Sequence, residues 1–171
     1  LNLLFLEPLV ADELDEGIIT SDYYISYDIT QDKILFSKNI DEKIYPASLT
    51  KVMTALLLLD KYKLNDSIVV KYPNNYINVG KVAYIKENKE ITIENLLEFL
   101  LVYSANDAAY IAALSVSENV DNFIILMNQK AKELNMINTN YVNPDGIDEL
   151  NHYTTISDLL NPKANNNVDA K

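Results

Sequence analysis

The longest apolar pattern in the chain lies over residues 46–59, where a proline is followed by a stretch that ends in four consecutive leucines. Pro46 restricts φ to a value that suits a helix entrance. The residues after it leave no wide polar stripe, so we predict a loop that runs into a helix with apolar residues on nearly every side. We expect such a helix to be central and buried.

Ser48 and Lys51 fall in the first turn of this predicted helix. A spacing of three residues places both on one helix face, where the hydroxyl and the amine can meet. The partial positive charge at a helix N-terminus also favours a developing alkoxide. Together these features indicate an activated nucleophile beside a base. The pair alone is weak evidence, because a capped core helix with a surface lysine gives the same pattern.

The segment before this helix shows three patterns. Residues 1–11 are apolar but too short to span a bilayer, so they are either the tail of a secretory signal or a short packed segment. The acidic residues 12–16 are typical of a solvated linker. Alternating residues over 23–28 and 33–37 predict a β-hairpin, with Asp32 at a turn position that tolerates a left-handed conformation.

The segment after the helix predicts further helices from apolar spacing. Thr92 is a candidate N-cap for the first of them. In the amphipathic helix over residues 121–134, the side chains expected to face inward are Phe123, Ile124, Met127, Ala131 and Leu134. The predicted helices span residues 93–103, 108–116 and 121–134, and one more covers 155–160.

Less regular stretches lie between the helices. Residues 67–72 and 82–86 are short strands or extended loops by pattern. The sequence Asn-Pro-Asp-Gly over residues 143–146 is a strong turn signal, which we interpret as structural.

Composition narrows the chemistry. The chain has 171 residues and a net charge of −11, its basic residues are all lysine, and it contains no cysteine. Acidity without clustered positive charge argues against a nucleic-acid partner. The lack of cysteine excludes disulfides and thiolate metal sites, and we expect no metal and no cofactor. His152 is the single histidine, and we interpret it as a hydrogen-bonding residue in a turn rather than a catalyst.

Three separated stretches occur in a fixed order: YPASLTKVMTALL (residues 45–57), YSANDAA (103–109) and NPDGID (143–148). Together they resemble the D-alanyl-D-alanine carboxypeptidases, the low-molecular-mass penicillin-binding proteins. The resemblance implies an α/β fold class of the α+β type, with an antiparallel sheet and a helical subdomain, as in DD-peptidases and β-lactamases.

The resemblance runs from Tyr23 to Leu160 and suggests a division of the chain. Residues 1–22 form an N-terminal segment, residues 23–160 form a partial serine DD-peptidase domain, and residues 161–171 form a polar tail.

The resemblance also implies roles for four residues. Ser48 attacks the carbonyl between two D-alanines of a peptidoglycan stem peptide, and its backbone N–H forms half of an oxyanion hole. Lys51 takes the proton from Ser48, for which burial and nearby positive charge must lower its pKa. Ser104 relays the proton to the leaving amine, and Asn106 hydrogen-bonds Lys51 and the substrate amide. β-Lactams would acylate Ser48 in the same pose.

Simpler interpretations exist for the second stretch. In isolation, Ser104 and Asn106 are most simply caps of the helix that follows. For Asp107, a capping or orienting role and a reactive role both stay open.

The family's third motif, Lys-Thr-Gly on a strand that lines the cleft, does not occur. The chain has three glycines, and none has a lysine two residues before it. We therefore expect these residues to be part of a longer protein. In that case the fold is incomplete at its C-terminal strands, and one side of the helix over residues 52–59 is left uncovered.

The leading hypothesis is an enzyme: a serine D-Ala-D-Ala carboxypeptidase that acts in the periplasm or elsewhere outside the cytoplasm. Its partners would be peptidoglycan stem peptides and, as inhibitors, β-lactams. Membrane association through a C-terminal segment stays open. One alternative is a β-lactamase in which Glu149 serves as the deacylating carboxylate. Another is a non-catalytic pseudoenzyme or wall-binding module, which the missing motif favours.

Overall fold

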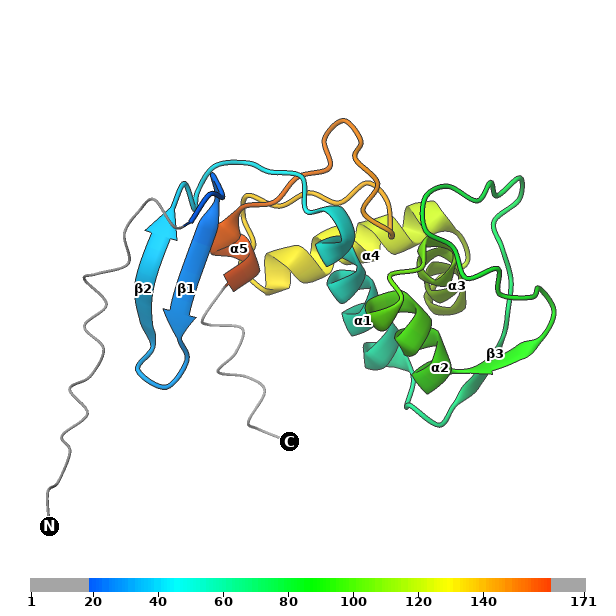
Figure 1. Cartoon of the computed structure of the whole chain (residues 1–171). Coiled ribbons are helices and arrows are strands. Elements are labelled where there is room, and N and C mark those ends of the chain that lie inside the picture. Colours follow the sequence, from blue (N-terminus) through cyan, green and yellow to red (C-terminus); the bar gives the residue numbers. More distant parts are fainter. Residues whose placement is uncertain (1–18, 161–171) are drawn as a thin grey trace, which may run out of the picture.

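The computed structural model describes residues 19–160, which combine helices with two small antiparallel sheets (Figure 1). This arrangement agrees with the predicted α+β class. The expectations for residues 1–18 and for the tail after residue 160 lie outside the described residues. In chain order the elements are β1 (Tyr24–Asp28), β2 (Lys33–Lys38), η2 (Ala47–Leu49), α1 (Thr50–Lys61), β3 (Ser67–Val69), β4 (Glu90–Thr92), α2 (Ile93–Leu97), η3 (Glu98–Val102), α3 (Asn106–Val116), α4 (Val120–Glu133) and α5 (Ile156–Leu160).

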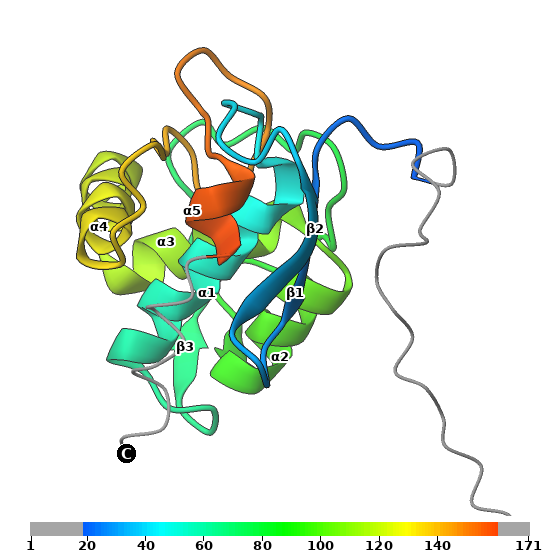
Figure 2. The same cartoon turned by 90° about the vertical axis from the view of Figure 1, so that its left-hand side faces the viewer.

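The predicted hairpin is present as β1 and β2, which pair antiparallel. Asp32 has a φ of +52°, so the left-handed turn position assigned to it is confirmed. The Asp32 carboxylate also accepts a hydrogen bond from the Tyr27 hydroxyl across the turn. Figures 1 and 2 show the hairpin beside the helices, joined to α1 by an extended segment.

The helix α1 lies at the centre of the described residues and packs against α3, α4 and η3. Its buried face includes Met53 and Leu58. The opposite side carries Val52, Leu56 and Leu59, which are 50%, 41% and 45% exposed. The expectation of burial on every side is therefore wrong, because residues 19–160 cover this stripe only in part. The expectation of one uncovered side is confirmed.

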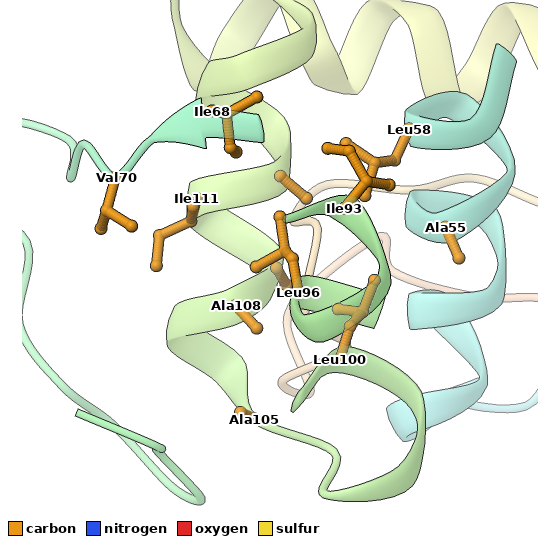
Figure 3. Close-up of a cluster of buried hydrophobic side chains, with 12 residues drawn as sticks. Ala55, Leu58, Ile68, Val70, Ile93, Leu96, Leu100, Ala105, Ala108 and Ile111 are labelled. Carbon is orange, nitrogen blue, oxygen red and sulfur yellow. The ribbon is translucent and has the colours of Figure 1, made fainter. Parts of the chain in front are cut away.

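Two apolar clusters hold the helices together. The first lies between α1, α2 and α3, where Leu58 points toward Ile93 (Figure 3). The second joins α1 and α3 to α4 through the fully buried Phe123 and Met127. Apolar spacing on each helix places these side chains on one face, and their burial fixes the helix arrangement.

The α4 helix largely follows the prediction. Phe123, Met127 and Ala131 face inward as expected. Ile124 and Leu134 are only half-buried, because they lie at the margins of the buried face.

The region around α2 departs from the prediction in two ways. The helix expected over residues 93–103 begins as expected, with the Thr92 hydroxyl accepting from the Asn95 N–H at 3.3 Å. It then changes into the π-helical turn η3 before residue 104. Residues 82–86 form a loop, one of the two predicted alternatives, whereas β4 is a strand that we did not predict. Its three residues are extended because they pair with β3, a contact made only in the tertiary structure.

Candidate active site

The Ser48 side chain is exposed at the entrance to α1. It lies in the 3₁₀ turn η2 rather than in the α-helix itself, and Lys51 follows in the first turn of α1. Ala47 adopts a φ of +47° just before it. A non-glycine residue in this region costs on the order of 1–3 kcal/mol, so the backbone is held in a strained shape beside Ser48.

Three polar groups meet at Ser48. The Lys51 Nζ lies 3.4 Å from the Ser48 Oγ. The Ser104 hydroxyl donates to the same oxygen at 3.0 Å, although it is 56 residues away in the chain. The structure thus brings the predicted nucleophile, base and relay residues together.

The Lys51 amine is buried, with only 2% of the residue exposed. Burial lowers the pKa of Lys51 because a charged amine loses its hydration, whereas the nearby Asp145 opposes this shift. The direction matches the expectation, and burial is its cause. The Nζ also donates to the Asp145 carbonyl oxygen at 2.6 Å, which fixes the amine close to Ser48.

Ser104 is half-buried and has a φ of +61°. The α3 helix that follows has Ala105 as its N-cap, without a side-chain hydrogen bond to the helix. The capping interpretation of Ser104 and Asn106 is therefore wrong. The left-handed turn instead directs the Ser104 hydroxyl toward Ser48.

Asn106 borders the site from the first turn of α3. Its side-chain amide donates to the Val79 carbonyl at 2.8 Å, and its backbone N–H donates to Lys81 at 2.7 Å. The predicted hydrogen bond to Lys51 is absent from the contacts between described residues. Asn106 is thus held by the loop between β3 and β4.

Asp107 is fully buried and orients that same loop. Its carboxylate accepts from the backbone N–H groups of Ala83 at 2.9 Å and Ile85 at 3.1 Å. Of the two roles left open for Asp107, the contacts fit orientation.

The turn over residues 143–146 contacts Lys51 and Thr54 of α1. The Asn143 side chain closes the turn by accepting from the Gly146 N–H at 2.8 Å. The Thr54 hydroxyl of α1 donates to the Pro144 carbonyl at 2.6 Å. The structural interpretation is confirmed, and the turn has a specific consequence: it holds the carbonyl that binds Lys51.

Asp145 itself is a site residue that the sequence reasoning missed. Only 2% of it is exposed, and its Oδ2 has no hydrogen-bond partner among the described residues. Burial raises the pKa of Asp145 above its ordinary value. The one signal in the sequence was a carboxylate inside a turn motif that we interpreted only as structure.

His152 is almost fully buried behind η2. Its Nδ1 accepts from the Val142 N–H at 3.1 Å, so the Nε2 carries the proton and donates to the Thr50 hydroxyl at 2.8 Å. Burial lowers the pKa of His152, which favours this neutral form. The interpretation as a hydrogen-bonding residue is confirmed.

Glu149 is exposed, and its carboxylate accepts from the Asn143 amide at 3.4 Å. It makes no hydrogen bond to the groups around Ser48, so the β-lactamase alternative gains no support from its position. Within residues 19–160, no group of histidine and carboxylate side chains is arranged to hold a metal ion.

A comparison with known families agrees with this geometry. The chain matches the family described as D-alanyl-D-alanine carboxypeptidase over residues 11–163. The chain belongs to this family. The resemblance drawn from the three sequence stretches is thereby confirmed. The matched residues include all three stretches.

Individual D-alanyl-D-alanine carboxypeptidases are similar in sequence and structure. DacF of Bacillus subtilis (strain 168) is 36% identical over 131 residues, covering 74% of this chain and 34% of DacF. The crystal structure of DacD from Francisella tularensis gives a TM-score of 0.78 at 28% identity, covering 88% and 38% of the two chains. Penicillin-binding protein 5 from Haemophilus influenzae gives 0.74 at 30% identity, covering 85% and 44%.

These structures confirm the predicted DD-peptidase fold for the described residues. The chain spans less than half the length of each of these three carboxypeptidase-family relatives.

Proposed function

We propose that this chain carries the nucleophile and base of a penicillin-binding serine D-Ala-D-Ala carboxypeptidase. One observation carries the proposal: an exposed serine oxygen lies within reach of a buried lysine amine and a second serine hydroxyl. The two distances are 3.4 Å from Lys51 and 3.0 Å from Ser104. This is the arrangement that an activated nucleophile requires.

Acylation proceeds in two proton transfers. The neutral Lys51 amine accepts the Ser48 proton as the Ser48 Oγ attacks the carbonyl carbon between the two D-alanines. The tetrahedral intermediate places its negative charge on the former carbonyl oxygen, where the Ser48 backbone N–H donates. Collapse breaks the C–N bond, and the proton returns from Lys51 through Ser104 to the departing amine. The products are free D-alanine and an acyl ester on Ser48.

In deacylation, water is the nucleophile and Ser48 is the leaving group. A water molecule gives its proton to the neutral Lys51 as its oxygen attacks the ester, and Ser48 leaves with a proton from Lys51. Asn106 lies at the border of the site, where its amide can bind the substrate peptide. Its contact with Val79 also ties the substrate position to the adjacent loop.

The substrate and compartment follow from the same proposal. Peptidoglycan stem peptides lie outside the cytoplasmic membrane, so the enzyme would act there, in the periplasm or its equivalent. Among the described residues, no helix is long and apolar enough to cross a membrane. We draw the substrate class from family membership and from the acyl-transfer geometry.

Covalent labelling with a fluorescent penicillin tests the proposal. The full-length protein that contains these residues should form a labelled band, and Ser48→Ala should abolish it because the acylated oxygen is removed. The matched control is Ser37→Ala, which changes an exposed serine on β2. Absence of labelling in the parent protein would favour the pseudoenzyme alternative, and labelling that persists in Ser48→Ala would exclude Ser48 as nucleophile.

Asp145 should shift the pH dependence of acylation through its effect on the pKa of Lys51. Only the neutral form of Lys51 accepts a proton, so the acylation rate should rise with pH through the pKa of Lys51. The Asp145 charge raises that pKa. Asp145→Asn should therefore move the acidic limb of the pH–rate profile to lower pH.

The measurement for this prediction is the rate of penicillin acylation between pH 5 and 9 (a range of about four pH units that spans typical shifted lysines). Asp148→Asn is the control, because Asp148 is an exposed carboxylate three residues away. A limb that moves to higher pH in Asp145→Asn, or moves equally in both variants, would contradict the assigned role.

A further inference from the structure

A hollow lies on the loop between β3 and β4. It has a volume of about 540 Å³. Its lining combines aromatic rings, side-chain amides and one carboxylate, and it contains no lysine. The lining residues are Tyr72, Pro73, Asn74, Asn75, Tyr76, Asn78, Tyr84, Ile85 and Glu87.

Two tyrosines that line this hollow stack on each other. The rings of Tyr72 and Tyr76 stack with centroids 5.1 Å apart, and Tyr110 of α3 lies 4.9 Å from Tyr76. The Tyr72 hydroxyl donates to the Ile85 carbonyl at 2.7 Å, which links two parts of the loop that line the hollow. The lining thus includes an aromatic pair that packs against Tyr110 of α3 and is hydrogen-bonded to the opposite part of the loop.

The rim of the hollow carries Tyr84 in an unusual state. This residue has a φ of +57°, and 73% of its surface is exposed. A bulky side chain is rarely found at positive φ, because its Cβ crowds the backbone. Neither core packing nor a turn that needs tyrosine accounts for this cost. Strain of this kind clusters at ligand clamps.

The loop segment that carries Tyr84 is also hydrogen-bonded to the first residues of α3. Asn106 bonds to Val79 and Lys81, and Asp107 accepts from Ala83 and Ile85 on either side of Tyr84. Asn106, which borders the acylation site, and its neighbour Asp107 are therefore hydrogen-bonded to the same loop segment, residues 79–85, that carries Tyr84.

We propose that this hollow binds a neutral sugar ring of the peptidoglycan glycan strand while the attached stem peptide reaches Ser48. An exposed tyrosine offers an apolar face to a sugar ring, and the side chains of Asn74, Asn75 and Asn78 offer donors and acceptors to its hydroxyl and N-acetyl groups. The hollow is unsuited to an anionic peptide, because Glu87 is its one charged lining residue. This inference rests on the proposed function for its substrate class.

Binding can be tested without catalysis. A soluble oligomer of N-acetylglucosamine is titrated against the full-length protein by ligand-observed NMR. We expect saturable binding, about tenfold weaker binding in Tyr84→Ala, and near-parental binding in Tyr84→Trp, which keeps an aromatic face. The matched control is Tyr23→Ala, which removes a tyrosine from the remote hairpin.

A glycine variant separates binding from folding. Glycine adopts positive φ without crowding, so Tyr84→Gly should unfold at a melting temperature no lower than that of the parent and still lose the sugar. Unchanged affinity in Tyr84→Gly and Tyr84→Ala would overturn the proposal, as would absence of sugar binding in the parent. Preference for a sugar-free stem peptide, weakened by Tyr84→Ala, would also overturn it.

Penicillin labelling, measured on the same samples, distinguishes the two hypotheses. Labelling without sugar binding would reject the glycan subsite and keep the carboxypeptidase. Sugar binding that depends on Tyr84 without labelling would keep the subsite and reject the enzyme.

Discussion

Replacing Lys51 with methionine should lower the rate at which penicillin acylates Ser48 by about 10²–10⁴-fold, the range typical of a lost general base. Methionine has nearly the same length and fills the buried position without a charge, so the effect should come from the missing amine. Lys51→Arg should be equally impaired, because a guanidinium keeps its proton at neutral pH. The measurement is the second-order rate constant for acylation by a fluorescent penicillin.

The control for this prediction is Lys61→Met at the other end of α1. The Lys61 amine is exposed and donates to backbone carbonyls at the end of α3, at 2.9 and 3.0 Å. This variant should acylate at the parental rate. A Lys51→Met protein that folds and acylates within about threefold of the parent would show that another group deprotonates Ser48, since a general base contributes at least about a hundredfold.

Gly146→Ala should unfold the protein more easily, by about 3 kcal/mol or more. Gly146 has a φ of +88°, and a Cβ at this position would overlap the Ala47 carbonyl oxygen and crowd the Thr50 hydroxyl. A left-handed non-glycine residue costs roughly 1–2 kcal/mol, and overpacking against a fixed backbone adds roughly 1–3 kcal/mol. The free energy of unfolding, measured by denaturant titration, checks the expected loss.

The second glycine at positive φ provides the comparison. Gly80 has a φ of +70°, and a Cβ there would meet the Asn106 side-chain amide at 2.8 Å. That side chain can move, so Gly80→Ala should destabilise less than Gly146→Ala. Equal losses would mean that the contact between the 143–146 turn and η2 contributes little.

Acylation should also fall in Gly146→Ala beyond the loss of folded protein. The turn that contains Gly146 presents the Asp145 carbonyl to Lys51, so displacement of the turn moves the base away from Ser48. Penicillin acylation per folded molecule is the appropriate measure.

Two residues around Ser48 have strained backbone conformations. Ala47 and Ser104 both have positive φ; Ala47 precedes Ser48, and the Ser104 hydroxyl donates to the Ser48 Oγ. Each conformation is unfavourable locally and is maintained by packing of the surrounding turns. Under the proposed function, such strain would pre-organise the Ser48 and Ser104 hydroxyls before substrate arrives, which would lower the ordering required during the reaction.

Interactions between residues close together in the sequence determined many of the helices and turns of this protein. Apolar spacing specified α1, α3 and α4, and turn chemistry specified the left-handed position of Asp32, because both depend on neighbours within a few residues. The 3₁₀ turn, the π-helical turn and β4 were missed. Each of these is stabilised by contacts with distant residues, which short-range patterns do not contain.

For the site, the sequence placed Ser48 beside Lys51 through helix spacing, and family resemblance added Ser104 and Asn106. Only the tertiary structure decided that the Lys51 amine is buried and held by the Asp145 carbonyl, and that Asn106 faces Val79 rather than Lys51. The physical reason is that a pKa and a hydrogen-bond partner depend on which groups exclude water around an atom. Here those groups come from the 143–146 turn and the loop between β3 and β4, which reach the site only on folding.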